Sequence, residues 1–278
     1  MKYTKRGQIS IFIILAIVLV YIIVGIFWMI NNNKQSSMQK DFFNQANVKP
    51  TMDSIRNNII DCRDNSIKNS LKTIGIQGGY YDKPGKYFDL KWAFIPYYYY
   101  QGAYSIPTKT IIEKELQKSI DKEFTDCINN VKFENFEITH EVSKSKATIK
   151  NGEVDVTIDM PISIKRESNV QTLEMKDAET SQISKLYDII DLASAIAESH
   201  KEDSKLICIS CVGKMAEQKD LYVDFVQFSE YNTLAIIIDN VTSSQPYTFE
   251  FLNKYTGNEK PSEVQFETEP VPNIPQMK

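Results

Sequence analysis

The segment 9–30 constrains this chain more than any other feature, because it is 22 residues long and carries no charged side chain. As a helix rising about 1.5 Å per residue it would be about 33 Å long, enough to cross a hydrocarbon core of about 30 Å. A cleavable secretory signal is shorter and ends in small residues, whereas this segment ends in Phe27-Trp28-Met29-Ile30. We therefore predict a transmembrane helix over residues 8–30 that contacts the lipid bilayer through residues 9–30. The alternative is an unusually long buried core helix.

Charges on either side of this segment predict its orientation. Residues 1–7 contain three basic side chains and no acid, whereas only Lys34 and Lys40 follow the segment closely. Because Lys and Arg remain on the cytoplasmic side, we expect a cytoplasmic N-terminus and an extracytoplasmic remainder, residues 31–278. The whole chain carries a net charge of −4 and residues 1–7 carry +3, so residues 8–278 carry −7. An acidic exterior without a basic stripe argues against a nucleic-acid partner.

The start of the apolar segment has a recognisable pattern, Lys5-Arg6-Gly7-Gln8-Ile9-Ser10. This run resembles the archaeal class III signal segment of type IV prepilins, in which a basic pair and Gly precede Gln and an apolar helix. The resemblance covers about the first thirty residues and implies processing between Gly7 and Gln8 by a prepilin peptidase. Phe12 stands where pilins carry a Glu associated with subunit assembly. As a whole the chain resembles single-pass surface proteins of small-genome archaea, a likeness that brings no catalytic residues.

The remainder of the chain divides by composition. Residues 31–50 form a polar juxtamembrane connector, residues 51–258 a folded extracytoplasmic domain, and residues 259–278 a proline-rich flexible tail. Three stretches of the domain have apolar residues spaced by three and four, which is typical of amphipathic helices. They cover residues 52–74, where Gly75 and Gly78-Gly79 end the pattern, the region after Pro107 with apolar positions from 112 to 128, and about 181–199. On the second helix, Glu113, Lys114, Glu115, Lys118 and Asp121 are expected to face away from the core.

Other stretches alternate with a period of two. Asn151-Gly152 predicts a tight hairpin that feeds a strand over 153–164, in which Pro161 indicates an edge position or a bend. Further strands are expected at about 221–228, 233–239 and 247–255. Each of these strands has one solvent-exposed face, and hairpins are expected to connect them. Both features favour antiparallel sheets packed against helices, so the expected fold class is α+β.

Four cysteines lie in the segment that we place outside the cell, where oxidation favours pairing. Cys62 lies on the apolar stripe of the first helix and Cys127 beside that of the second, so we predict a Cys62–Cys127 disulfide. The alternative is two buried free thiols.

The remaining pair, Cys208 and Cys211, forms a C-x-x-C, a spacing that supports thiol–disulfide exchange at a helix N-terminus. The motif lacks the aromatic residue usual before it in redox proteins, so a local structural disulfide or packed thiols is the preferred interpretation. Zinc is not expected, because a second C-x-x-C or a His pair is missing from the sequence.

Residues 80–104 contain 11 aromatic side chains and predict a hairpin, with a turn at Pro84-Gly85 and an alternating strand over 87–94. Because successive side chains of a strand alternate faces, some of the four consecutive tyrosines should be exposed or line a groove. We therefore single out Trp92, Tyr97, Tyr98, Tyr99 and Tyr100 as a hypothetical binding face for glycans or envelope proteins. The alternative is a packed hairpin with hydroxyls at its rim.

Motifs of known chemistry are otherwise scarce. The two histidines, His140 and His200, have no nucleophile or carboxylate arrangement beside them in the sequence, and no metal site or cofactor is expected. Asn240-Val241-Thr242 is one N-glycosylation sequon, so Asn240 is a candidate for modification. The sequence thus favours a non-catalytic, membrane-anchored binding or structural module of the cell surface. A pilin-like filament subunit and a thiol–disulfide oxidoreductase are the alternatives.

Overall fold

The computed structural model describes residues 51–175, 179–202, 209–242 and 245–255. The chain divides into two compact units, Met1–Ile55 and Arg56–Lys278, and the fold below is essentially that of the second. The proposed processing site, membrane span, connector and proline-rich tail lie outside the described residues. Among the helices of the described ranges, none is both long and apolar enough to cross a membrane.

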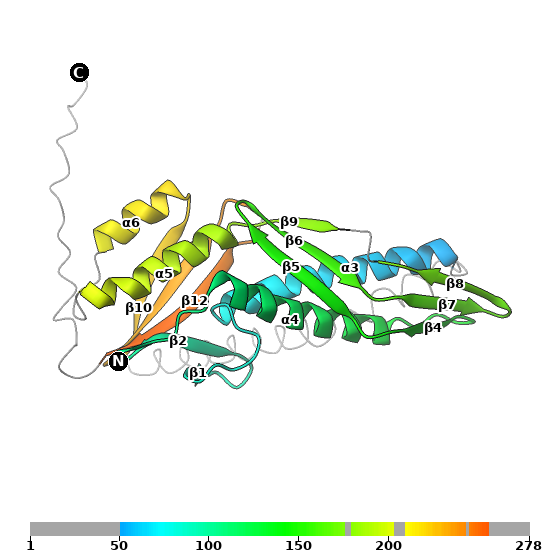
Figure 1. Ribbon diagram of the computed structural model, residues 1–278, viewed down its shortest axis with the longest axis horizontal. Helices are drawn as coiled ribbons and strands as arrows, with labels where there is room; N and C mark the ends of the chain where they lie inside the picture. Colours follow the sequence, from blue (N-terminus) through cyan, green and yellow to red (C-terminus); the bar gives the residue numbers. More distant parts are fainter. Residues whose placement is uncertain (1–50, 176–178, 203–208, 243–244, 256–278) are drawn as a thin grey trace, which may run out of the picture. The chain divides into compact units, whose positions relative to one another are not determined.

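The fold class is α+β, as expected, and helices occur at all three sites that the periodicity indicates (Figure 1). The helices are α3 (Met52–Ile76), α4 (Lys109–Asn130), α5 (Leu186–Glu202) and a fourth that we did not predict, α6 (Ile209–Gln218). The expected start of the third helix at about residue 181 is wrong, because residues 180–183 pair as a strand before the helix begins. A short apolar pattern of four residues does not distinguish the end of a strand from the first turn of a helix.

The end of α3 is fixed by close packing against a strand. A Cβ on Gly75 would lie 2.2 Å from the carbonyl oxygen of Thr248, and one on Gly78 would lie 2.5 Å from that of Glu250. Gly78 also has a φ of +50°, a conformation that favours glycine. The helix therefore runs through Gly75 and ends only after it has reached the sheet.

That sheet contains six of the described strands, in the order β1-β2-β12-β11-β10 with β3 paired to β2. Their bounds are β1 (Tyr87–Asp89), β2 (Phe94–Tyr100), β3 (Ala103–Tyr104), β10 (Tyr222–Ser229), β11 (Asn232–Asp239) and β12 (Tyr247–Lys254). The last three match the predicted strands, whereas the expected single strand over 87–94 is wrong. The chain turns there, and the amide of Leu90 donates to the carbonyl of Ala93 at 2.9 Å.

The pairing of β2 with β12 is parallel, although every other pairing among the described strands is antiparallel. Parallel neighbours are not joined by a hairpin, so this pair depends on contacts between distant parts of the chain. The rings of Phe88 in β1 and Phe228 in β10 lie 4.7 Å apart although these strands are at opposite ends of the sheet order. The sheet is therefore strongly curled, and Ile95, Tyr97 and Leu252 form a small core on this side.

Two smaller antiparallel sheets lie between α4 and α5 in the sequence. One is β4 (Glu137–His140), β7 (Ile162–Arg166) and β8 (Asn169–Leu173); the other is β5 (Lys144–Lys150), β6 (Glu153–Asp159) and β9 (Thr180–Ile183). The predicted strand over 153–164 breaks at Pro161, so that β6 and β7 belong to different sheets. The expected bend at Pro161 is confirmed, and the chain passes there from one small sheet to the other.

Helix α4 covers the free edge of β5 (Figure 1). Three polar side chains spaced by four residues reach its backbone: Glu113 accepts from the amide of Ile149, Gln117 donates to the carbonyl of Ala147, and Asp121 accepts from the amide of Ser145. Four helical residues rise about 6 Å and two strand residues about 6.6 Å, so the two repeats match. An edge covered in this way cannot pair with another chain.

This contact corrects the expected orientation of α4. Glu113, Glu115 and Asp121 are buried or half-buried, whereas Lys114 and Lys118 are exposed as predicted. The carboxylate of Glu115 accepts from the amides of Tyr81 and Asp82 at 3.0 and 2.8 Å and binds the ammonium of Lys118. A heptad-like pattern cannot identify such groups, because they are buried by hydrogen bonding to backbone rather than by apolar character.

Candidate functional site

The run of tyrosines in β2 is mostly buried. Tyr97, Tyr98 and Tyr99 are buried, and Tyr100 is half-buried. The Tyr98 hydroxyl donates to the carbonyl of Gly78 at 2.9 Å and its ring stacks on Phe251, whereas Tyr97 packs on the other side of the strand against Leu252. Our expectation that the alternating run exposes a binding face is therefore wrong for the first three tyrosines, because both faces of β2 are covered.

Trp92 and Tyr100 remain accessible. Trp92 lies in the turn between β1 and β2 and is 75% exposed. The turn is held by Asp89, whose carboxylate accepts from the amide of Lys91 at 2.7 Å and pairs with the ammonium of Lys83 at 2.9 Å. An exposed indole on a hydrogen-bonded turn is suited to contacts with a partner, because it offers a large apolar surface at low entropic cost.

The predicted Cys62–Cys127 disulfide is present and joins α3 to α4. The two Cα atoms are 5.8 Å apart, and the sequence separation is 65 residues. Cys62 itself is buried. The apolar stripes of the two helices thus contact each other at this point, as the sequence indicated.

Cys211, of the C-x-x-C, lies in the first turn of α6, is exposed, and is disulfide-bonded. Cys208 lies outside the described residues. None of the described cysteines is free, and within the described ranges no cluster of three or more His, Cys, Asp or Glu side chains could hold a metal ion.

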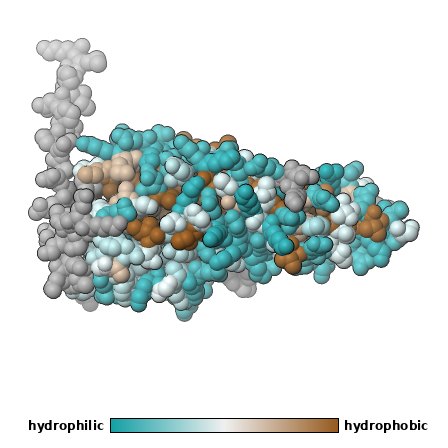
Figure 2. Space-filling view, viewed as in Figure 1, coloured by the Kyte–Doolittle hydropathy of each residue, from teal (hydrophilic) through white to brown (hydrophobic). Residues whose placement is uncertain are grey.

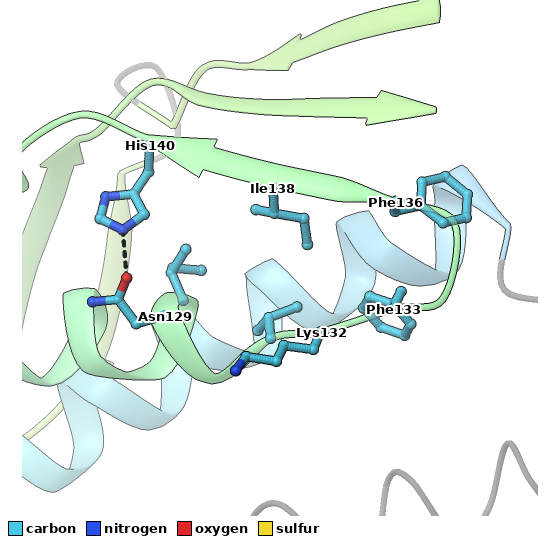
Figure 3. Close-up of a pocket in the computed structure, with 8 residues that line it drawn as sticks. Asn129, Lys132, Phe133, Phe136, Ile138 and His140 are labelled. Carbon is cyan, nitrogen blue, oxygen red and sulfur yellow. Dashed lines mark hydrogen bonds between the residues drawn. The ribbon is translucent and has the colours of Figure 1, made fainter. Parts of the chain in front are cut away.

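An open groove that we did not predict lies where α4 leads into β4 (Figure 3). Its volume is about 340 Å³, and its lining consists of Ile128, Asn129, Val131, Lys132, Phe133, Phe136, Ile138 and His140. The helix end supplies the first residues, the loop 131–136 the next, and alternate residues of β4 the last two. The guanidinium of Arg166 lies over the Phe136 ring at 5.2 Å.

Polar groups of this groove are His140, Asn129 and Lys132. One imidazole nitrogen of His140 contacts the Asn129 side-chain oxygen at 3.0 Å, as Figure 3 shows, and the other contacts the carbonyl of Glu141 at 2.8 Å. The Lys132 side chain is exposed. Its eight lining residues thus combine apolar side chains with one imidazole, one amide and one ammonium group.

A second, more open groove of about 460 Å³ lies beside the glycosylation sequon, between the end of α6, the start of β10 and the turn after β11. Asn240 lines it and is exposed. The carboxylate of Asp239 accepts from the amides of Val241 and Thr242 at 3.1 and 3.0 Å, which holds the turn that carries Asn240. The position is accessible to modification, and occupancy stays a prediction.

Burial and hydrogen bonding alter several acids and tyrosines. Burial raises the pKa of Asp121, while hydrogen bonds from Ser143 and Ser145 act in the opposite direction. The pKa of Asp155 is lowered, first by Lys150 and then by the Ser181 hydroxyl. Desolvation raises the pKa of Tyr98 and that of Tyr247. These groups lie within packed regions, so their shifts reflect structure rather than a catalytic arrangement.

Figure 2 shows a largely hydrophilic face interrupted by several separate hydrophobic groups. Comparison of the chain with protein-family models, with curated proteins and with solved structures finds no match in any of the three. Function is therefore inferred from the groups described above.

Proposed function

We propose that the chain is a single-pass, membrane-anchored protein whose extracytoplasmic domain is a non-catalytic binding or structural module of the cell surface. The observation that carries this proposal is the disulfide between Cys62 and Cys127. Disulfides persist in oxidising compartments and are rare where glutathione and thioredoxin keep thiols reduced. An oxidised domain after a charge-free segment with basic residues before it agrees with an N-in, C-out orientation.

Binding rather than catalysis is supported by the composition of the candidate sites. The groove at the end of α4 combines apolar walls with His140 and Lys132, and the β1–β2 turn presents Trp92. Concave apolar sites with a few polar groups typically hold small ligands or peptide side chains. Envelope proteins and glycans are the proposed partners.

The orientation is tested on intact cells that produce the full chain. A membrane-impermeant reductant followed by an impermeant maleimide should label Cys127 and Cys211, and mass spectrometry of the peptides identifies the labelled positions. A matched variant, Thr4→Cys, should be labelled only after lysis, because residue 4 is placed in the cytoplasm. Labelling of Cys127 only after lysis would overturn the proposed orientation.

A second candidate function, thiol–disulfide exchange, is favoured by one observation at α6. Cys211 is exposed, disulfide-bonded and in the first turn of a helix, where the helix dipole stabilises a thiolate. In an insulin assay of such exchange, dithiothreitol reduces the disulfide of the protein and is itself oxidised. The resulting protein dithiol then reduces an insulin disulfide, and the disulfide of the protein forms again. Insulin reduction in the presence of dithiothreitol should be accelerated by the full chain and lost in Cys211→Ser. The Cys62→Ser/Cys127→Ser variant should keep that activity, and equal rates in all variants would dismiss this function.

A further inference from the structure

Two lysine side chains from distant parts of the chain converge on one tyrosine ring. The ammonium groups of Lys86 and Lys254 each lie 5.0 Å from the ring centroid of Tyr100, and that of Lys254 is 3.5 Å from the Tyr100 hydroxyl. Lys254 is at the end of β12, and Lys86 directly precedes β1, where its carbonyl accepts from the amide of Tyr97 at 3.1 Å. The backbone around all three groups is therefore held in the sheet.

Among the described residues, these two charges have no anionic partner. Neither ammonium forms an ion pair with a carboxylate within the described part of the chain, and the carboxylate of β1, Asp89, is already bound by Lys83 and the Lys91 amide. Holding two like charges on one ring is unfavourable unless an anion comes between them or solvent screens them. A phosphate group offers an oxygen to each ammonium group and a further oxygen to the tyrosine hydroxyl.

Exposed aromatic side chains accompany the pair. Tyr87 and Phe88 follow Lys86 directly and are exposed, and the exposed Trp92 lies in the turn after β1, at the opposite end of β2 from Tyr100. Phe228 is exposed beside Phe88. Trp and Tyr next to Lys are the side chains enriched at the membrane–water interface, where rings sit at the level of the headgroups. A site for a soluble anion would not need this apolar surround.

We propose that Lys86, Lys254 and the Tyr100 hydroxyl bind the phosphate of a phospholipid headgroup, while Trp92, in the turn of the same hairpin, inserts into the same bilayer surface. This inference rests on the proposed membrane anchor, which keeps the bilayer of the same chain within reach. A 20-residue connector spans at most about 70 Å when fully extended, so the anchor keeps the bilayer within reach of the domain.

The test uses the fluorescence of the full chain, which has two tryptophans, Trp28 and Trp92. In Trp28→Phe only Trp92 reports, and in Trp92→Phe only Trp28 does. Each variant is placed in nanodiscs of brominated phosphatidylcholine, with or without phosphatidylglycerol. We expect quenching of Trp92 that increases when phosphatidylglycerol is present, because an anionic surface attracts the lysines.

Charge removal sharpens this test. In the Trp28→Phe background, Lys86→Gln/Lys254→Gln should lower the ratio of docked to undocked domain by roughly thirtyfold, because each Lys near an anionic surface contributes about 1 kcal/mol. A matched control, Lys122→Gln/Lys165→Gln, removes two exposed lysines that already pair with Asp126 and Glu137 and should leave the ratio unchanged. Near-UV circular dichroism checks that both variants are folded. Equal effects of the two double variants would overturn the proposed site.

Different failures are distinguishable. If Trp28 is quenched but Trp92 is not, the anchor stands and the headgroup site is wrong. If Trp28 is not quenched, the anchor fails and the inference falls with it. Inorganic phosphate should reduce Trp92 quenching more than chloride of equal ionic strength, and equal effects would overturn the phosphate site. Binding of phosphate or an acidic polysaccharide through both lysines, without Trp92 quenching, would overturn the assignment to a lipid.

Discussion

The large sheet and the two small sheets are built in different ways. In the small sheets each strand pairs with a partner at most about thirty residues away, and the pairings are antiparallel. In the large sheet, β2 pairs in parallel with β12, so Tyr97 lies opposite Leu252. The first arrangement is specified by local turns and hydrophobic alternation, whereas the second requires that distant segments meet.

Within the large sheet, aromatic side chains are buried at the centre and exposed at the edges. The centre of the large sheet buries Tyr98, Phe249 and Phe251, each at 1% exposure or less. The exposed aromatics Phe88 and Phe228 belong to its two edge strands. In one of the small sheets, α4 adds polar contacts to the edge strand β5. Long-range pairs form late because loop closure costs entropy before contacts compensate for it, so we expect the small sheets to form first.

The largest expected effect comes from the disulfide, which joins α3, packed on the large sheet, to α4, packed on β5. Cys62→Ser/Cys127→Ser should lower the free energy of unfolding by about 4 kcal/mol, because a closed loop of this length no longer restricts the unfolded chain. Urea titration followed by circular dichroism measures the loss. Hydrogen exchange should show the large and small sheets opening at different urea concentrations in the variant. Adding a reductant to the double variant should not destabilise α3 and α4 further. A loss in the free energy of unfolding of less than about 1 kcal/mol would contradict this role of the disulfide.

Next in size is the helix-covered edge of β5. Asp121→Ala leaves the Ser145 amide and the Ser143 hydroxyl without their acceptor, and we expect a loss of about 2 kcal/mol. Asp121→Asn keeps an acceptor oxygen and should lose clearly less. Hydrogen exchange should locate the effect at β5 and β6, while β11 and β12 stay protected. Uniform exchange across all sheets would show that the regions are a single cooperative unit.

A smaller effect is expected inside the large sheet. Tyr98→Phe removes the hydroxyl that donates to the buried carbonyl of Gly78 but keeps the ring on Phe251, so unfolding should become easier by about 1 kcal/mol. Tyr187→Phe, at an exposed position of α5, is the matched control and should change stability little. Stability loss of equal size in both variants would mean that the Gly78 contact contributes nothing.

The smallest effect concerns pH in the β5–β6–β9 sheet. Because Lys150 and Ser181 hold the pKa of Asp155 below its ordinary value, the stability that this carboxylate contributes is present above the unfolded pKa and is lost as pH falls through the lower folded pKa. Asp155→Asn should therefore be less stable than the natural chain at pH 7, and the difference should shrink below about pH 4. The stability difference between Lys150→Gln and the natural chain should shrink on acidification in the same way. A difference that stays constant on acidification would refute the coupling.

Local patterns were sufficient for part of this fold. The spacing of apolar residues identified α3 and α4, the alternation identified β10, β11 and β12, and Asn151-Gly152 identified the β5–β6 hairpin. The stripes of two helices also predicted the Cys62–Cys127 pair. The start of α5 and all of α6 were missed, because short segments take their conformation from what they pack against.

Neither candidate site could be predicted from local sequence patterns. The groove at His140 joins a helix end, a loop and a strand, and the pair Lys86 and Lys254 joins residues 168 positions apart. The aromatic segment was predicted from the sequence, but of the five residues selected within it, Tyr97, Tyr98 and Tyr99 are buried, whereas Trp92 and Tyr100 are accessible. Alternation predicts which residues share a face, and it does not reveal that a second layer covers the other face.

The sequence by itself determined the charge-free segment, the elements with strong periodicity and the helix faces that carry Cys62 and Cys127, because these depend on neighbours along the chain. Only the tertiary structure decided the parallel contact of β2 with β12, the burial of the tyrosine run and the polar cover of β5. Those features depend on backbone groups and layers brought together from distant positions, and hydrogen bonding to backbone leaves no hydrophobic pattern in the sequence.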